Sequence, residues 1–376
     1  MKRFMGLWFP FFLVACQPAV ISPTQTVTLP PPNIVIETIT PSPIPTLTLT
    51  PSATPTIEEA IFPYTIDGLR QHEFQSGEIK IRETLDETEF YTSYLIEYPS
   101  DGLTITGVMQ IPKGDGPFPV IVMNHGFFSR SVYHSGDGTD RASAFLNQYG
   151  YITLASDYRT WGDSDAGVSL FYSGLVIDVI NLIHAIPSIS EADPERVGIW
   201  GHSMGGGVTM KVLTILGGLD TPNIKAGVLY SPVSADDADI INRWGMGCFG
   251  DYVAGEKIVG CNSSDVIPFS LPLQLQDAYR FTASNKDALE KVAPFYHLDA
   301  VNVPIQIHYG TEDGKVISGT PPEWSLKLTQ GLRDAGKDVV LYSYEDEGHS
   351  FIGEPWFEFM RRTLRFFDTN VKNASQ

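Results

Sequence analysis

Along residues 90–370, segments in which apolar residues have the spacing of a β-strand alternate with segments in which they have the spacing of a helix. The segments 93–99 and 103–112 alternate apolar and polar side chains and are joined by Ser100-Asp101-Gly102, which predicts a β-hairpin. The segment 118–126 is a short, continuous apolar run, typical of a strand that is buried on both faces. From there on, apolar runs of this kind take turns with longer segments of helical spacing.

This alternation indicates the α/β class, with a mostly parallel central sheet and helices on both faces. The further predicted strands are 151–158, 196–200, 224–232, 303–310 and 338–345. The predicted helices are 141–150, 168–186, 205–216, 321–335 and 354–368. No internal repeat or Pro/Ser linker interrupts this region, so we predict one domain over 58–376.

Residues 233–302 break the alternation. This segment follows a predicted strand at the edge of the sheet where ligands bind in open α/β folds. We predict an inserted cap, which is either a lid over the site or a pair of helices that only pack. The segment also contains Cys248 and Cys261.

The first 57 residues differ from the rest in composition. Lys2 and Arg3 precede an apolar run to Ala15, which has the length of a signal peptide and is too short to span a bilayer. Residues 13–16, Leu-Val-Ala-Cys, resemble a bacterial lipobox, which implies a lipoprotein signal peptide over 1–15 and lipid on Cys16. The alternative is an ordinary signal peptide followed by a chance cysteine.

Residues 17–57 hold ten Pro and ten Thr and a single charge, Glu37. Such a segment cannot bury enough apolar surface to fold, so 16–57 is predicted to be a disordered linker. It would hold the domain off a membrane surface, outside the cytoplasm. In that compartment the two cysteines left after Cys16 are expected to form a Cys248–Cys261 disulfide, unless both are free and buried.

The formal net charge is −19, which disfavours nucleic acids and other polyanions as partners. No group of histidines, cysteines or carboxylates has metal-ligand spacing, and no phosphate-binding or dinucleotide-binding glycine motif is present. We therefore expect no metal and no cofactor.

Residues 201–205, Gly-His-Ser-Met-Gly, lie between the strand 196–200 and the helix 205–216. A serine hydroxyl attacks a carbonyl only if it stands clear of the backbone beside a base. A sharp strand-to-helix turn achieves this, and glycines two residues before and after the serine relieve the crowding. This context predicts that Ser203 is a nucleophile, rather than an incidental serine in a glycine-rich turn.

The base and its acid should follow the serine in the order Ser, Asp, His. Asp313 follows the strand 303–310, and His349 follows the strand 338–345, so both should lie near Ser203. Glu312 is the second candidate for the acid. Asp346 and Glu347 are expected to form an acidic rim.

The main-chain N–H groups of Met204 and Phe127 are the expected oxyanion donors. His125 is expected to pack beneath the second donor, and His202 to face its neighbours rather than substrate. His308 lies in a predicted strand and is expected in the core.

These motifs resemble the α/β-hydrolase superfamily, and most of all the prolyl oligopeptidase catalytic domain and the dienelactone-hydrolase-like esterases. The resemblance spans roughly 90–370 and is carried by residues 125–127, 156–165, 201–206, 309–316 and 347–351. Residues 156–165 are similar to the family segment Asp-Tyr-Arg-Gly-x-Gly-x-Ser, from which Thr160-Trp161 departs.

The resemblance implies an α/β-hydrolase fold and a serine hydrolase with a small-molecule ester or short peptide as substrate. Prolyl oligopeptidases carry a β-propeller before the catalytic domain, whereas only about thirty residues precede the first hairpin here. This favours esters over peptides. Thioester cleavage, and a membrane-anchored binding protein without chemistry, are the remaining alternatives.

Overall fold

The computed structural model describes residues 55–219, 224–245 and 272–373. The chain divides into two units, 1–53 and 54–376, and all the described residues belong to the second. Cys16, Cys248 and Cys261 lie outside the described residues, as do the predicted signal peptide and most of the predicted linker. In the ranges described, no helix is long and apolar enough to cross a membrane.

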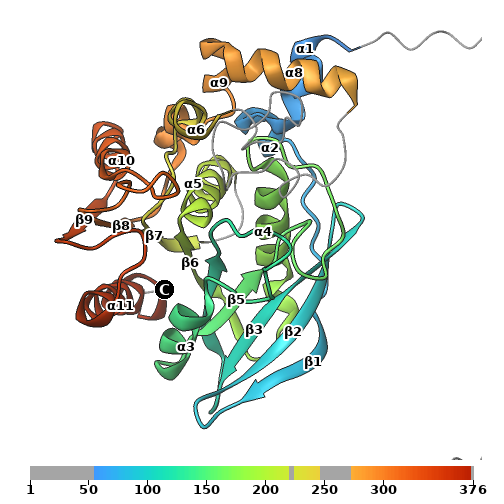
Figure 1. Ribbon diagram of the computed structural model, residues 1–376. Helices are drawn as coiled ribbons and strands as arrows, with labels where there is room; N and C mark the ends of the chain where they lie inside the picture. Colours follow the sequence, from blue (N-terminus) through green and yellow to red (C-terminus); the bar gives the residue numbers. More distant parts are fainter. Residues whose placement is uncertain (1–54, 220–223, 246–271, 374–376) are drawn as a thin grey trace, which may run out of the picture. The chain divides into compact units, whose positions relative to one another are not determined.

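A nine-stranded sheet runs through the domain in the order β1-β2-β3-β5-β4-β6-β7-β8-β9 (Figure 1). The first three strands pair antiparallel, as do β3 and β5, and every later pairing is parallel. The strands are β1 (Lys80–Glu87), β2 (Tyr91–Ser100), β3 (Leu103–Pro112), β4 (Phe118–Asn124), β5 (Ile152–Ser156), β6 (Ala192–His202), β7 (Ile224–Tyr230), β8 (Ile305–Gly310) and β9 (Val339–Tyr344).

Helices cover both faces of the sheet, as the alternation predicts. Helices α4, α5 and α10 share one hydrophobic core with the sheet, and α3 and α11 share another on the opposite face. The described helices are α1 (Ile57–Ile61), α2 (Ile66–Arg70), α3 (Asp140–Gln148), α4 (Ser173–Ala185), α5 (Met204–Leu216), α6 (Asp237–Trp244), α8 (Leu273–Ser284), α9 (Lys286–Glu290), α10 (Pro322–Asp334) and α11 (Gly353–Phe367).

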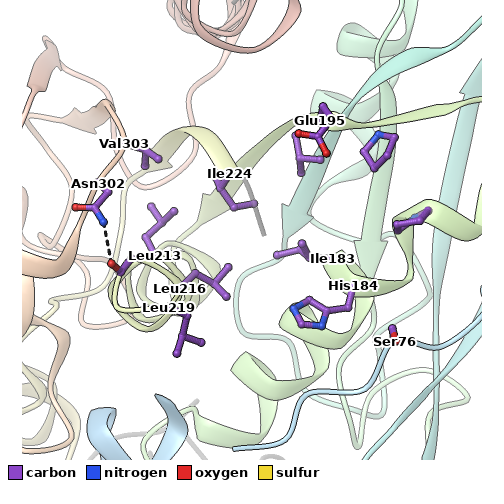
Figure 2. A pocket seen from close by; sticks show the side chains of 14 residues that line it. Ser76, Ile183, His184, Glu195, Leu213, Leu216, Leu219, Ile224, Asn302 and Val303 are labelled. Carbon is purple, nitrogen blue, oxygen red and sulfur yellow. Dashed lines mark hydrogen bonds between the residues drawn. The ribbon is translucent and has the colours of Figure 1, made fainter. Parts of the chain in front are cut away.

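A cavity of about 640 Å³ lies at the amino ends of the parallel strands. Figure 2 shows that Ile183 and His184 of α4 face Leu213 and Leu216 of α5 across it, near Ile224 at the start of β7. The residues predicted to form the catalytic site follow the carboxyl ends of the strands. The cavity is therefore separate from that site.

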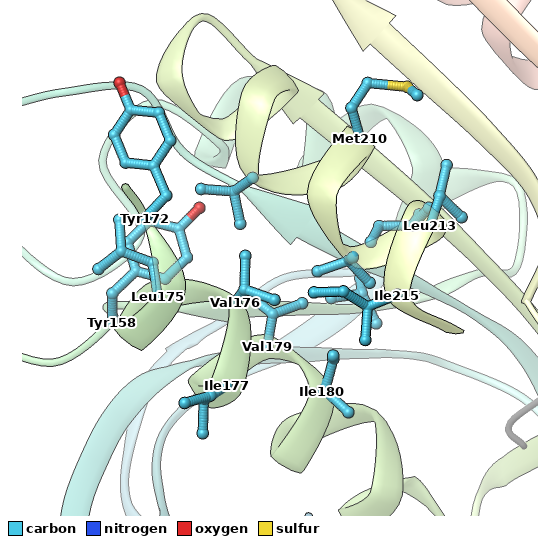
Figure 3. Close-up of a cluster of buried hydrophobic side chains, with 14 of the residues drawn as sticks. Tyr158, Tyr172, Leu175, Val176, Ile177, Val179, Ile180, Met210, Leu213 and Ile215 are labelled. Atoms are coloured by element: carbon cyan, nitrogen blue, oxygen red, sulfur yellow. The ribbon is translucent and has the colours of Figure 1, made fainter. Parts of the chain in front are cut away.

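The central parallel strands and helices α4 and α5 form the most deeply buried part of the molecule. Side chains of α4, among them Val176 and Val179, lie opposite those of α5, including Leu213 and Ile215 (Figure 3). Every residue of α5 is buried. Complete burial of one such aliphatic side chain stabilises the fold by about 1.5–3 kcal/mol, so α5 gives the turn before it a rigid support.

Most of the predicted elements are confirmed within a few residues. The predicted hairpin is β2–β3, in which Ser100 pairs with Leu103 and the two turn residues, Asp101 and Gly102, have φ of 51° and 77°. Positive φ at both positions matches the twist of the flanking strands. The helix predicted over 168–186 begins only at Ser173, because Phe171 and Tyr172 are left-handed, with φ of 50° and 63°.

The described part of the predicted cap contains α6, α8 and α9. The first of these, α6, packs close to the loop that follows β8, through Arg243 and Trp244.

At the amino end of the domain, α1 starts at Ile57 and is capped by Thr56, whose side chain accepts a hydrogen bond from the Glu59 N–H. Regular structure thus begins one residue before the predicted domain boundary.

Candidate active site

Ser203 stands on a sharp turn between β6 and α5, as predicted. Its backbone has φ 56° and ψ −121°, a conformation that is strained for any residue other than glycine. The turn points the side chain away from the sheet, and the residue stays partly accessible to solvent. The local geometry therefore presents the hydroxyl at the carboxyl edge of the sheet.

The two glycines that flank Ser203 are required by close backbone contacts. A Cβ atom on Gly201 would lie 2.2 Å from the Gly205 carbonyl oxygen. A Cβ on Gly205 would lie 2.0 Å from the carbonyl oxygen of Asn124, at the end of β4. Any side chain at either position would push α5 away from the sheet and displace the serine.

The predicted base and acid meet Ser203 in one chain of hydrogen bonds. The Ser203 Oγ lies 2.8 Å from His349 Nε2, and His349 Nδ1 lies 2.9 Å from Asp313 Oδ2. Because Nδ1 faces a carboxylate, it carries the ring proton, which leaves Nε2 free to accept the serine proton. The arrangement is therefore competent for general-base activation of the serine.

Asp313 is held as a carboxylate by four hydrogen bonds. Oδ1 accepts from the N–H groups of Gly314, at 2.7 Å, and Thr320, at 2.9 Å. Oδ2 accepts from His349 and from the Thr320 hydroxyl, at 2.7 Å. Burial alone would raise the pKa of Asp313, but the hydrogen bonds from His349, Thr320 and Gly314 and the electrostatic attraction of His349 outweigh it and lower the pKa.

Glu312, the second candidate for the acid, is excluded by its position. Its carboxylate forms an ion pair with Lys315, and its N–H donates to the Glu347 carbonyl. Asp346 is exposed, and the Glu347 carboxylate accepts a hydrogen bond from the N–H of Ile352. Neither belongs to the triad, as expected.

The predicted oxyanion donors lie beside the serine. Met204 is the first residue of α5, and the loop that carries Phe127 passes so close that a Cβ on Gly126 would lie 3.1 Å from the Ser203 Cβ. Within the described ranges, neither the Met204 nor the Phe127 N–H donates to another backbone or side-chain group. Both remain available to a developing oxyanion.

Aromatic residues pack against the loop that carries Phe127 and help to fix it. His125 is buried between Tyr133 and Tyr158, with ring centroids 4.6 Å and 4.3 Å away, so its predicted packing role is confirmed. Trp161 Nε1 donates to the carbonyl of Phe128 at 2.8 Å. In the sequence, this tryptophan stands out only as a departure from the family segment.

Thr160, the other departure, has φ of 85°. The family segment has glycine at this position, and glycine adopts a positive φ without strain. The backbone conformation typical of glycine is therefore retained although the residue is a threonine.

The side chain of His202, within the turn, contacts the base His349 and its neighbours rather than facing substrate. Its Nε2–H donates to the His349 carbonyl at 3.1 Å, and its ring stacks on Tyr230 with centroids 4.4 Å apart. Burial and the nearby His349 lower the pKa of His202 to about 3, so the ring is neutral at physiological pH.

His308 is fully buried, as expected. Among the described residues, no group of histidines, cysteines and carboxylates could hold a metal ion.

Sequence reasoning missed three residues that shape the site. Thr320 binds the triad acid through both its N–H and its hydroxyl, whereas Arg243 and Trp244 bind the loop that follows the acid. Threonine, arginine and tryptophan have no fixed spacing from the motif residues. Only the folded loop brings them to Asp313.

Two family models match the chain in adjacent parts. Residues 116–255 match the model described as serine aminopeptidase, S33, and residues 269–374 match the prolyl oligopeptidase family. Neither match covers half of the chain.

Among curated relatives, the lysophosphatidylserine lipase ABHD12 of Xenopus tropicalis is 34% identical over 171 residues, which cover 43% of this chain and 42% of the relative. The chain thus spans less than half of the length of the curated relatives it matches.

Solved structures share the fold. Acetyl xylan esterase 1 from Thermoanaerobacterium sp. JW/SL YS485 has a TM-score of 0.56 at 17% identity, covering 82% of this chain and 93% of that one. The acylaminoacyl peptidase of Pyrococcus horikoshii has a TM-score of 0.52 at 19% identity, covering 77% of this chain and 44% of that one. With the parallel sheet, the nucleophile turn and the order Ser203, Asp313, His349 all in place, the chain belongs to the α/β-hydrolase superfamily, and its site has the geometry that a serine nucleophile requires.

Proposed function

We propose that this protein hydrolyses carboxylic esters through an acyl-enzyme. The observation that carries the proposal is the continuous hydrogen-bonded path from Ser203 Oγ through the His349 ring to the buried Asp313 carboxylate. Such a path activates a serine hydroxyl as a nucleophile at neutral pH.

Each step then uses groups already in position. His349 Nε2 takes the proton of Ser203 as Oγ attacks the ester carbonyl. The Met204 and Phe127 N–H groups stabilise the tetrahedral oxyanion, and His349 returns the proton to the leaving alcohol. Water, deprotonated by His349, then attacks the acyl-enzyme, and Ser203 regains its proton when the acid is released.

The names of the curated relatives favour an ester as substrate. One is a lysophosphatidylserine lipase, and another, 29% identical over 135 residues, is the esterase FrsA of Shigella boydii. The two family models favour the alternative, a serine peptidase that acts on small peptides.

A substrate panel separates the two functions. The purified full chain is assayed with 4-nitrophenyl esters of two, four and eight acyl carbons and with aminoacyl and Xaa-Pro 4-nitroanilides, and the Ser203→Ala variant is the blank. We expect turnover of esters and none of anilides above the blank. Turnover of anilides with a kcat/KM comparable to that of the esters would establish the peptidase instead.

We propose further that the protein is exported and tethered to a membrane by lipid on Cys16. The support is in the sequence: an apolar run that ends in Leu13-Val14-Ala15-Cys16, followed by a Pro/Thr-rich segment with one charge. Lipid attachment requires the thiol.

Cys16→Ser is therefore expected to move the protein from the membrane fraction to the soluble fraction of the bacterial host, as measured by centrifugation and immunoblotting. Cys248→Ser is the matched control and should leave the distribution unchanged. A wild-type chain that is already soluble, or a variant that still sediments with membranes, would contradict the proposal.

A further inference from the structure

The carboxyl end of α6 binds the loop that follows the triad acid. Arg243 Nη2 donates to the carbonyls of Gly314 and Val316, each at 3.0 Å, and its Nε donates to that of Ile317 at 3.2 Å. Trp244 Nε1 donates to the same Ile317 carbonyl at 2.6 Å. Two side chains of the inserted segment thus occupy three carbonyls of one short loop.

This loop, residues 314–320, wraps around the Asp313 carboxylate. It supplies the Gly314 N–H and both the N–H and the hydroxyl of Thr320 to the two carboxylate oxygens. At Gly319 the approach is so close that a Cβ would lie 2.5 Å from Asp313 Oδ1. A shift of the loop would therefore change the direction in which Asp313 faces His349.

In the middle of the loop, the side chains do little to fix it in place. Val316 and Ile317 are 65% and 48% exposed, so they contribute little packing. The carbonyl groups of the same residues are the ones that Arg243 binds. The described contacts thus fix this part of the loop through its backbone rather than through a hydrophobic anchor.

We propose that Arg243 is a positioning residue for the triad acid. Through the backbone of loop 314–320 it sets the orientation of the Asp313 carboxylate and hence the competence of His349 as a base. The inserted segment then contributes to the geometry of the triad. This inference rests on the proposed function of Ser203, His349 and Asp313.

The chemistry of the side chain explains why arginine serves here. A guanidinium is planar and presents donors in a fixed fork, so one side chain can reach three carbonyls at defined angles. A lysine ammonium is a single point and cannot replace that geometry. The rings of Trp244 and Trp324, whose centroids lie 5.3 Å apart, each lie 5.9 Å from the Arg243 guanidinium carbon and help to fix it.

The test compares Arg243→Lys with the wild-type chain and with Arg361→Lys, an exposed arginine on α11 that pairs with Glu354. Two rates are measured: covalent labelling of Ser203 by a fluorophosphonate probe, and kcat with a 4-nitrophenyl ester. Arg243→Lys is expected to lower both by 10- to 100-fold, the effect of a small misplacement of a catalytic group, while KM changes less than threefold. Arg361→Lys should match the wild type.

A second comparison, made in the Asp313→Asn variant, distinguishes a positioning role of Arg243 from a general loss of structure. In an Asp313→Asn chain there is no carboxylate to orient, so adding Arg243→Lys should lower the labelling rate and kcat by less than twofold. An equal loss in both backgrounds, or a wild-type labelling rate for Arg243→Lys, would overturn the inference. If Arg243→Lys is not recovered folded, Trp244→Phe goes through the same comparison with an expected loss of about threefold, since it removes the bond to Ile317 and reduces the ring contact with Arg243 and Trp324.

The two proposals fail in different ways. If the wild-type chain is not labelled by the probe at all, the proposed function is wrong. If the wild-type chain is labelled and the Arg243 variant is labelled equally fast, only the role of Arg243 is wrong.

Discussion

Ser203→Ala is expected to lower kcat for a 4-nitrophenyl ester by about 10⁶-fold, close to the uncatalysed background, because the attacking atom is removed. Since His349 and Asp313 act only through the serine, no other group in the triad can replace it. The fold should persist. Alanine takes the same backbone conformation as serine and loses one hydrogen bond, so the free energy of unfolding should change by only about 1 kcal/mol.

Initial rates and thermal unfolding of the same preparations check this expectation. Ser190→Ala is the matched control, since its hydroxyl is exposed and bonds to the neighbouring Glu191. It should retain full activity. A Ser203→Ala chain that keeps more than one hundredth of the wild-type kcat would show that another residue carries the chemistry.

Asp313→Asn is expected to lower kcat by about 10⁴-fold at neutral pH with little change in KM. The cause is the direction of one amide group. Asp313 Oδ1 accepts from two backbone N–H groups, of Gly314 and Thr320, which would oppose an –NH₂ group placed there. The asparagine must therefore keep its oxygen at that side and turn its –NH₂ toward His349.

An –NH₂ that donates to His349 Nδ1 moves the ring proton to Nε2. The ring nitrogen that faces Ser203 then carries a proton and cannot accept another, so the base is lost although every heavy atom stays in place.

Glu312→Gln is the matched control for this prediction. Its carboxylate pairs with Lys315 and lies outside the triad, so kcat should stay within about twofold of the wild type. If Asp313→Asn kept a tenth of the wild-type kcat while Glu312→Gln lost it, the acid would have to be reassigned to Glu312.

The parts of the fold that could be predicted are those in which local pattern and tertiary burial agree. The strand at 118–124 is a continuous apolar run because both of its faces are covered, and the Asp101-Gly102 turn has the residues that its positive φ angles require. By contrast, β1 was missed. All eight of its residues are exposed, so no apolar periodicity marks this edge strand.

The triad could be predicted because each member follows a strand end in a known chain order. The groups that hold the triad acid in place could not be predicted. Thr320 reaches Asp313 only because a tight loop folds back over seven residues, and Arg243 reaches the same loop from a helix more than seventy residues earlier. Both contacts depend on tertiary structure and leave no periodic signal in the sequence.

Selection for stability and selection for chemistry act in opposite directions at position 203. The left-handed backbone there costs a serine about 1–3 kcal/mol, a cost that glycine largely avoids. A laboratory evolution campaign that rewards heat resistance alone would therefore tend to replace the one side chain that defines the enzyme. Under the proposed function, the serine is therefore expected to be retained only where hydrolysis itself is selected.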